Sequence, residues 1–315
     1  MIVDVPRWTA VPFALSYRVG EVTVFRKRLR ALALQAHFFT LSDDPGDPPP
    51  PVERFKADVE VIVTRSHPVR EQLPAVTAHD GVLRYVMARY ARFHTDLSGS
   101  FDEYLARFSS KSRNTLRRKV RRLVEHPDGV AMRTYATPEE MAEFLARAGA
   151  VSALTYQHRL LDAGLPTDAA YLSKLQALAA NDSVRGYLLV LGEKPIAYLC
   201  CPASDDILRY GYLGYDPAHA DLSPGTVLQY LAFEALFGEQ RFRAFDFTDG
   251  QGEHKRFFGT HETQCADICY FPNSYRARFW VRLHRLFDCG SAGLVQVAER
   301  LGVKSKLKRL VRRLT

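Results

Sequence analysis

The fold is decided by residues 184–202, which read VRGYLLVLGEKPIAYLCCP. Apolar side chains dominate both halves of this stretch, and Gly192-Glu193 between them has the composition of a tight turn. Two apolar runs of strand length joined by so short a turn predict an antiparallel hairpin, Val184–Leu191 with Pro195–Pro202. A sheet is therefore expected here, and the flanking segments can be read as additions to it.

The segments that follow the hairpin extend this sheet and cover it with helices. Ser223 is a natural N-cap and Pro224 suits the first position of a helix that runs to about Phe237. The other expected elements are a strand at Ile207–Tyr215, a strand at Arg243–Phe247, a helical turn at Glu253–Phe258 and a strand at Gln264–Phe271. The order strand, strand, strand, helix, strand, helix, strand predicts an α/β fold of the α+β type with a mixed sheet. Neither GxGxxG nor a P-loop occurs, so nucleotide-binding folds with those signatures are not supported.

The residues before the hairpin are less regular. Alternating patterns predict strands at Phe13–Tyr17 and Val22–Arg26, joined through Gly20, and another at Ala57–Thr64. Residues 42–51, SDDPGDPPPP, predict a surface loop or linker. Helices are expected after the capping box Ser100–Glu103, over the basic stretch 109–126, from Pro138 to Ala148 with Thr137 as its cap, and over 168–180. Four segments result: β-rich residues 1–97, basic and connecting helices at 98–183, a core at 184–275 and basic amphipathic helices at 276–315.

Composition and charge limit the class of protein. Of the 315 residues, 47% are hydrophobic and 25% are charged, and the net charge is +8 at pH 7. This is a globular composition whose charge favours anionic partners such as a nucleotide phosphate, an acidic carrier protein, anionic lipid or nucleic acid. Residues 1–20 lack the pattern of a signal peptide, and no apolar run approaches the ~20 residues of a membrane span, so a cytoplasmic location is expected. Buried, reduced thiols, without a metal site, are predicted for Cys200, Cys201, Cys265, Cys269 and Cys289.

Four motifs carry a resemblance to a known family. They are FSSKSRNTLRRKVRRL at 108–123, GEKPIAYLC at 192–200, YDPAHADLSPGTVLQYLAFEAL at 215–236 and DFTDGQGEHKRFFG at 246–259. Their order and spacing resemble the GNAT superfamily of acyltransferases, in particular the CelD/BcsL type associated with cellulose and exopolysaccharide biosynthesis. FemAB-type transferases are similar, more distant relatives. The resemblance implies a GNAT acyl-CoA N-acyltransferase fold, and relatives imply a degenerate second GNAT-like half in the N-terminal region.

The loop before the long helix is the candidate binding site for the acyl donor. A helix N-terminus offers free N–H groups and the positive end of a dipole, which suit a phosphate, and Gly225 lets the backbone approach a ligand. In GNAT relatives this loop holds the pyrophosphate of coenzyme A, which implies cofactor-binding roles for Ser223, Pro224, Gly225 and Thr226. The sequence departs from the family's usual basic and glycine residues here. The donor is therefore acetyl-coenzyme A, another acyl-coenzyme A or an acyl carrier protein, and an ordinary capped helix is the structural alternative.

Direct acyl transfer needs a base for the acceptor and donors for the thioester oxygen. Asp246 ends a strand close to the acceptor cleft of relatives, and His254 has a pKa range suited to base work. Tyr212 is a candidate proton donor to the leaving thiolate, and Lys255 a candidate ligand for an anionic acceptor. Each residue also has a purely structural alternative. Asp246 would be a turn residue, His254 and Lys255 would be surface side chains, and Tyr212 would pack in the core or sheet.

Two basic helices suggest anionic partners. Seven cationic residues and no acid occur within residues 111–122, and Arg113, Arg117 and Arg121 form one stripe. Like charges at this spacing repel by roughly 0.2–0.5 kcal/mol per pair, so the stripe is a candidate site for an anionic substrate. Residues 303–315, VKSKLKRLVRRLT, predict a basic amphipathic helix that either packs on the protein or contacts the inner membrane peripherally.

Three functions remain open at this point. The leading one is transfer of an acyl group from a phosphopantetheine thioester to an amine or hydroxyl of a sugar or another envelope or exopolysaccharide precursor. The second is FemAB-like transfer from aminoacyl-tRNA, although the basic helix lacks the interleaved aromatic residues that stack on bases, so nucleic acid is not the expected partner. The third is a non-catalytic accessory of a polysaccharide synthase.

Overall fold

The computed structural model describes residues 7–19, 22–35, 55, 58–70, 73–155, 164–250 and 252–300. The chain forms two compact units, residues 1–91 with 263–315 and residues 92–262. It passes from the first unit to the second within β5, Val82–Asp96, and returns within β12, His261–Pro272. These boundaries differ from the four segments expected from the sequence, because β5 and β12 each contribute residues to both units.

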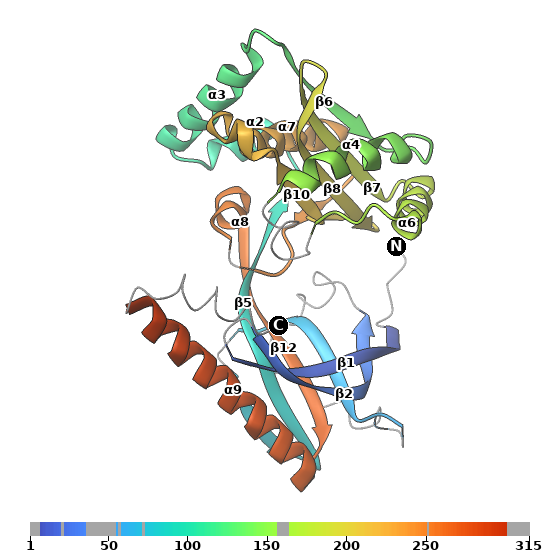
Figure 1. The fold of residues 1–315 in the computed structure, drawn as a ribbon, viewed down its shortest axis with the longest axis vertical. Helices are drawn as coiled ribbons and strands as arrows, with labels where there is room; N and C mark the ends of the chain where they lie inside the picture. The colour runs from blue at the N-terminus through green and yellow to red at the C-terminus, as the bar shows by residue number, and fades with distance from the viewer. Residues whose placement is uncertain are drawn as a thin grey trace. The chain divides into compact units, whose positions relative to one another are not determined.

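The first unit is a sheet covered by one long helix, α9, Tyr275–Arg300. Its strands follow the order β1-β2-β3-β12-β5, and β4 pairs with β5. β2 and β3 are parallel, whereas β1 and β2 form a long antiparallel hairpin. Figure 1 shows α9 running along this sheet. Leu15, Tyr17 and Val61 of the sheet pack with Val281 of α9. The strands not yet bounded are β1 Arg7–Val19, β2 Val22–Gln35, β3 Val61–Pro68 and β4 Val76–His79.

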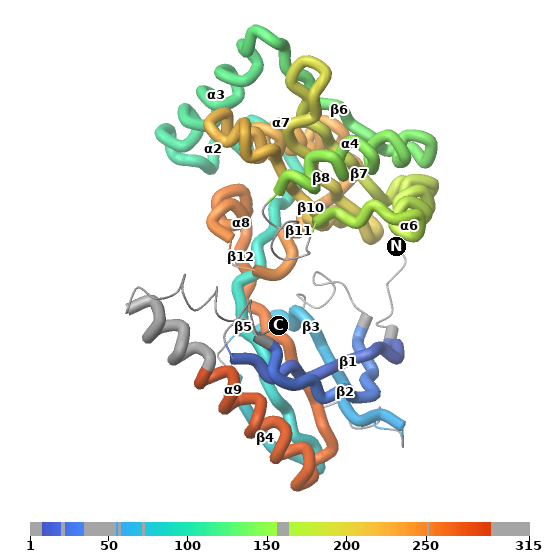
Figure 2. Tube along the Cα trace, in the orientation of Figure 1, coloured from blue at the N-terminus to red at the C-terminus, as the bar shows by residue number. Residues whose placement is uncertain are grey.

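The second unit is a mixed sheet with helices on both faces. Its strands follow the order β5-β11-β9-β8-β7-β6, and β10 also pairs with β8. β9 and β11 are parallel, and the other described pairs of this unit are antiparallel. The strands are β6 Val130–Tyr135, β7 Val184–Leu191, β8 Lys194–Ser204, β9 Ile207–Arg209, β10 Tyr212–Tyr215 and β11 Ala244–Asp246 (Figure 2). The helices are α2 Phe101–Ala106, α3 Ser110–Val124, α4 Met141–Leu154, α6 Ala169–Ala180, the 3₁₀ helix η2 Pro217–Leu222, α7 Pro224–Glu239 and α8 Glu253–Phe258.

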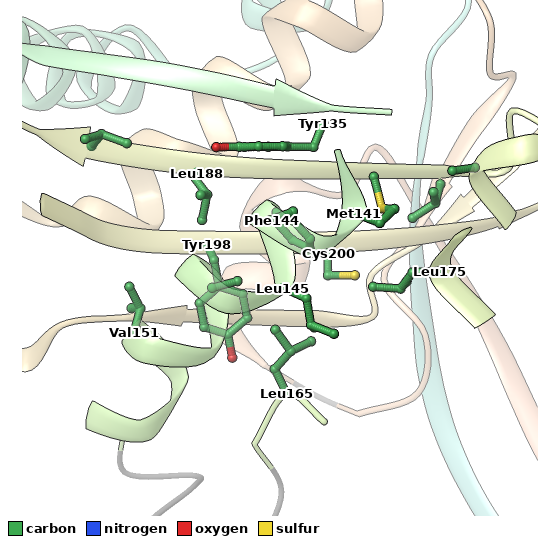
Figure 3. Packing of buried hydrophobic residues seen from close by; sticks show 14 residues of the cluster. Tyr135, Met141, Phe144, Leu145, Val151, Leu165, Leu175, Leu188, Tyr198 and Cys200 are labelled. Carbon is green, nitrogen blue, oxygen red and sulfur yellow. The ribbon is translucent and has the colours of Figure 1, made fainter. Parts of the chain in front are cut away.

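One face of the hairpin β7–β8 is buried beneath α4. Figure 3 shows Phe144 and Leu145 of α4 packed towards Leu188 of β7 and Tyr198 of β8. Gly186 allows this close contact, because a Cβ there would lie 2.8 Å from the Phe144 ring. All eight residues of β7 are buried, which explains why its sequence is continuously apolar apart from Arg185. Burial on both faces of a strand removes the usual alternation.

The predicted hairpin, the long helix and the helical turn are confirmed, as is the α/β class with a mixed sheet. The capping box is also confirmed: Ser100 accepts from the N–H of Glu103, and the Glu103 carboxylate accepts from the N–H of Ser100. The helix expected from Pro138 begins instead at Met141 and has no side-chain cap, because the Glu140 carboxylate accepts from the N–H groups of Ala136 and Thr137.

The N-terminal predictions were right in kind and wrong in length. β1 and β2 extend well beyond Phe13–Tyr17 and Val22–Arg26, and β3 begins at Val61 instead of Ala57. β5 and β6 had no counterpart in the prediction. Gly20, the segment 42–51 and the basic segment 303–315 lie outside the described residues.

The cysteines are free, but one differs from the expectation. Cys200, Cys201, Cys265 and Cys269 are buried, whereas Cys289 on α9 is exposed. Burial raises the pKa of the Cys200 thiol to about 12, so this thiol stays protonated and unreactive at neutral pH. Among the described residues, no group of three or more acidic, histidine or cysteine side chains is placed to hold a metal ion. No helix in the described part of the chain combines the length and apolar character needed to cross a membrane.

Candidate active site

The sheet of the second unit opens at Tyr210. The single strand predicted over Ile207–Tyr215 is in fact two strands, a correction that matters for the site. β9 pairs with both β8 and β11, whereas β10 has β8 as its described partner. Gly211 lies at the break, where a Cβ would come within 2.7 Å of the Cys200 carbonyl oxygen and 2.9 Å of Pro202. Strands β10 and β11 therefore separate beyond this point.

A cavity of about 490 Å³ lies at this opening. Its walls come from β10, the first turns of α7, and α8. The lining residues are Thr155, Tyr210, Leu213, Gly214, Tyr215, Pro217, Gly225, Thr226, Gln229, His254 and Phe258. A cavity of this size, apolar with a few polar groups, is typical of a small-molecule site.

The N-terminus of α7 lines the cavity through two of the four predicted donor-binding residues, Gly225 and Thr226. Ser223 has a left-handed backbone, φ 54°, and its hydroxyl makes no capping bond, so the predicted N-cap interaction is wrong. The N–H groups of Thr226 and Val227 both donate to the Ser223 carbonyl oxygen, at 3.0 and 3.1 Å. No described residue accepts from the N–H of Gly225, which leaves this donor available at the positive end of the helix dipole.

Gly225 also lets α7 approach β10. A Cβ at this position would lie 3.3 Å from Leu213 and 3.4 Å from Tyr215. The glycine therefore closes the wall of the cavity as well as exposing its backbone. Ser223 and Pro224, which precede this turn of α7, are not among the described lining residues.

Gln229 is the polar side chain that the structure adds to the predicted set. It lies one helical turn after Gly225 and is only 2% exposed. Both its Nε2 and its Oε1 are buried without a hydrogen-bond partner among the described residues, and the residue lines the cavity. A buried donor or acceptor left unpaired costs about 1–3 kcal/mol. A ligand that supplies one acceptor and one donor, such as an amide group, would satisfy both atoms.

His254 lies at the opposite wall, on α8, beside Tyr210. Their ring centroids are 5.5 Å apart at an interplanar angle of 39°. The side chain is exposed on one side, while partial burial of the imidazole, followed by the nearby Lys255 charge, lowers the pKa of His254. The neutral form is therefore favoured near pH 7, which is the form that can accept a proton.

Tyr210 is held at the centre of this wall. Its N–H donates to the Asp246 carbonyl oxygen at 2.8 Å, and its ring packs against Phe247 at 5.9 Å. Burial raises the pKa of the Tyr210 hydroxyl, which therefore stays protonated and can donate a hydrogen bond.

Lys255 does not line the cavity: its Nζ lies 5.7 Å from the centroid of the Tyr210 ring and donates to the Asp249 carbonyl oxygen. Burial lowers the pKa of Lys255, although the negative charges of Asp249 and Asp246 act to raise it.

Asp246 is fully buried and does not line the cavity. Arg92 donates from Nε to Oδ1 at 2.9 Å and from Nη2 to Oδ2, and the N–H of Thr248 donates to Oδ1 at 2.9 Å. Both carboxylate oxygens are thus occupied by donors within the protein. This geometry gives Asp246 the role of an anchor for β5, β11 and Tyr210, and it does not support the expected role as base.

The remaining predicted residues lie away from the cavity. Tyr212 packs against Tyr171 of α6, with ring centroids 6.0 Å apart, and joins the core beneath α4. Arg113, Arg117 and Arg121 belong to α3, which contacts α7 and whose buried residues are Leu116 and Leu123. Arg117 and Arg121 are exposed and Arg113 is half-buried. The structure therefore does not bring this stripe together with His254.

Three residues of the site were missed by sequence reasoning: Arg92, Tyr210 and Gln229. Gln229 left a signal, because it is a polar residue inside the apolar run of α7, TVLQYLAFEALF. Tyr210 and Arg92 left none, since tyrosine and arginine in strands are common and their roles depend on distant partners.

The chain was compared with known proteins. Residues 110–256, a little under half of the chain, match the family model described as an acetyltransferase (GNAT) domain. FemX is 14% identical to this chain and has a TM-score of 0.49, and the matched region covers 84% of this chain and 89% of the FemX chain. L-PGS from Bacillus licheniformis is 14% identical, covers 82% and 85%, and has a TM-score of 0.47. A GCN5-related N-acetyltransferase from Kribbella flavida is 16% identical, covers 79% and 84%, and has a TM-score of 0.39. No curated protein sequence matches the chain.

Proposed function

We propose that the unit formed by residues 92–262 transfers an acyl group from a phosphopantetheine thioester to an amine or hydroxyl of a polar acceptor. The observation that carries this proposal is the cavity where β10 and β11 separate, with Gln229 unpaired in its wall. The match of residues 110–256 to the GNAT domain supports acyl transfer as the reaction class.

The donor arm fits the chemistry of the cavity. A phosphopantetheine arm is a flexible chain with two amide groups, a phosphate at one end and the thioester at the other. The Gln229 carboxamide can accept from an amide N–H and donate to an amide oxygen. The free Gly225 N–H and the α7 dipole favour the phosphate end. Coenzyme A and an acyl carrier protein both present this arm, and both remain candidate donors.

His254 is the proposed base. The acceptor nitrogen or oxygen attacks the thioester carbonyl carbon, its proton passes to the neutral His254 imidazole, and the carbon–sulfur bond breaks. Protonated His254 then returns the proton to the leaving thiolate. The Tyr210 hydroxyl, which stays protonated, donates a hydrogen bond to the sulfur, and its ring centroid lies 5.5 Å from that of His254. General acid and base groups of this kind contribute about 10²–10⁴-fold each to a rate.

The acceptor is proposed to be a sugar or another envelope or exopolysaccharide precursor. The support for this class is the resemblance of residues 108–123, 192–200, 215–236 and 246–259 to the CelD/BcsL type. The net charge of +8 supports an anionic partner.

Calorimetric titration with coenzyme A, acetyl-coenzyme A and a holo-acyl carrier protein tests the proposal. We expect one of them to bind, and Gln229→Leu to weaken that binding about tenfold or more, the equivalent of 1.4 kcal/mol. The same variant should melt at a higher temperature than the wild type, because it removes a buried unpaired amide. Gln176→Leu, on α6 and not among the lining residues, is the matched control and should leave binding unchanged. Absence of binding to all three ligands would overturn the proposal in favour of a non-catalytic accessory.

The exposed basic face of α3 supports a second candidate, transfer from aminoacyl-tRNA. Arg117 and Arg121 are exposed and can reach phosphates, and Arg122 already bonds Asp221 at 3.2 Å. Contacts to RNA phosphates weaken steeply with salt. This candidate therefore requires salt-dependent tRNA binding that Arg117→Gln with Arg121→Gln reduces, and tRNA binding unaffected by this pair would eliminate it.

A further inference from the structure

Helix α9 carries an apolar stripe on its outer side. Its inner side, with Ala277, Trp280, Val281 and Phe287, packs on the sheet of the first unit. Tyr275, Phe279 and Leu286, four and seven residues apart, fall together on the opposite side. Their side chains are 96%, 58% and 69% exposed. A helix that only covered a sheet would be polar on this side.

The β1–β2 hairpin adds apolar side chains beside this stripe. Val19, Val24 and Phe25, near the turn of the hairpin, are 40%, 60% and 45% exposed. The Phe25 ring stacks on Trp280 with centroids 5.9 Å apart, and Trp280 contacts Phe279 at 5.3 Å. The hairpin and the helix therefore form one continuous surface, which we name the hairpin–α9 surface.

The described charged side chains that border the apolar stripe have one sign. In the described parts of segments 18–30 and 275–286, every exposed charged side chain is an arginine. These are Arg18, Arg26, Arg28, Arg30, Arg276, Arg278, Arg282 and Arg285. Arg30 is neutralised by Glu60, whose carboxylate lies 3.6 Å from its Nε. Lys27 lies over the Trp280 ring, 5.7 Å from its centroid.

We propose that the hairpin–α9 surface docks on an anionic lipid bilayer. An exposed apolar stripe bordered by arginines is the arrangement of an interfacial helix: the apolar groups enter the headgroup boundary while the guanidinium groups bind lipid phosphates. The exposed aromatic residues Tyr275 and Phe279 suit that boundary. Two copies of this chain are disfavoured as mutual partners, because their arginines would face one another.

The hairpin–α9 surface belongs to the first unit, whereas the proposed acyl-transfer site lies in the second. Docking through α9 would hold the enzyme at a membrane, where lipid-linked acceptors are found. The proposal does not depend on acyl transfer, because vesicle binding is measured without donor or acceptor.

Vesicle flotation of the full chain tests the proposal. The protein should float with phosphatidylcholine vesicles that contain phosphatidylglycerol, and much less with phosphatidylcholine alone. Phe279→Ser with Leu286→Ser should weaken binding to the anionic vesicles about tenfold or more, since buried apolar area contributes to interfacial binding. Arg282→Gln with Arg285→Gln should remove much of the preference for anionic lipid, at about 1 kcal/mol per arginine.

Control variants distinguish the hairpin–α9 surface from membrane contacts elsewhere on the chain. Val124→Ser removes a side chain that is 53% exposed on α3 and should leave binding unchanged. Trp8 and Trp280 are the two tryptophans of the chain, so in a Trp8→Phe background the Trp280 emission should shift to shorter wavelength on anionic vesicles. Wild-type binding retained by both double variants would place the membrane contact elsewhere on the chain and overturn the proposal. A dimer or an acidic protein partner, with no vesicle binding, would overturn it equally.

Discussion

Arg92 and Asp246 form a buried, two-point ion pair between β5 and β11. The Arg92 Nε lies 2.9 Å from the Asp246 Oδ1, and the second bond joins Nη2 to Oδ2. The Asp246 side chain is 0% exposed and the Arg92 side chain 11%. Since Asp246 also accepts the Tyr210 N–H through its backbone carbonyl, the pair fixes the strand that carries Tyr210 into the cavity wall.

The main effect of Asp246→Asn should be a lower free energy of unfolding, not a change in the acyl-transfer step. Removing one partner of a buried pair typically costs about 3–5 kcal/mol, because the other charge stays buried. Urea unfolding of the variant measures this loss. Asp221→Asn, which breaks the exposed pair with Arg122, is the matched control and should cost less than about 1 kcal/mol. A stable Asp246→Asn variant with greatly reduced turnover would restore Asp246 as the base.

Gly186→Ala should destabilise the second unit. The added Cβ would lie 2.8 Å from the Phe144 ring, which is fully buried beneath α4. Overpacking of this kind costs about 1–3 kcal/mol. Gly238→Ala provides the contrast, because its Cβ meets nothing within 4 Å in helix α7, and it should stabilise by about 0.5–1 kcal/mol. Equal effects of the two substitutions in thermal melts would contradict the packing described here.

The kcat/KM for acyl transfer should fall as the pH is lowered through the pKa of His254. Burial and the Lys255 charge lower this pKa below its ordinary value near 6.5. The base acts as neutral imidazole, so kcat/KM should hold through pH 6.5 and decline only at lower pH. His254→Gln should lower kcat and remove this decline, while acetyl-coenzyme A binding stays unchanged. A decline retained in His254→Gln would assign the base to another residue.

Stability should fall between about pH 6.5 and pH 4 because of His94. Burial, then the charge of His261 stacked at 4.8 Å, lowers the pKa of His94 from 6.5 to about 4. In this window the unfolded His94 binds a proton that the folded one does not, so the free energy of unfolding decreases as pH falls. The loss amounts to at most about 3 kcal/mol.

His94→Phe should flatten this dependence in unfolding curves measured at successive pH values. His79→Gln is the matched control, because it replaces a histidine whose side chain is 72% exposed. An unchanged slope in His94→Phe would show that another group titrates in this window.

Local patterns predicted what depends on near neighbours in the chain. The hairpin β7–β8 follows from two apolar runs around Gly192, and α2 from its capping box. The break between β9 and β10 was missed, because it depends on how Tyr210 bonds Asp246, far along the chain, while Gly211 lies against Cys200 and Pro202.

The candidate site also contains residues that the sequence predicted and residues that it did not. Gly225, Thr226 and His254 were predicted from motifs and do line one cavity. Asp246 and Tyr212 were predicted from position along their strands, and the structure gives them an ion pair and a core contact instead. Which face of a strand meets solvent depends on what packs against it, and period-two alternation does not reveal that for strands buried on both faces.

The sequence by itself determined the hairpin β7–β8 and the helices α7 and α8 that follow it, the GNAT resemblance and the basic character of α3, because these depend on local propensity, spacing and composition. Only the tertiary structure decided that Gln229 is buried without a partner, that Arg92 neutralises Asp246, and that Phe25 and Phe279 share one exposed surface through Trp280. Each of these facts joins segments distant in sequence, and long-range packing, not local preference, sets which side chains meet.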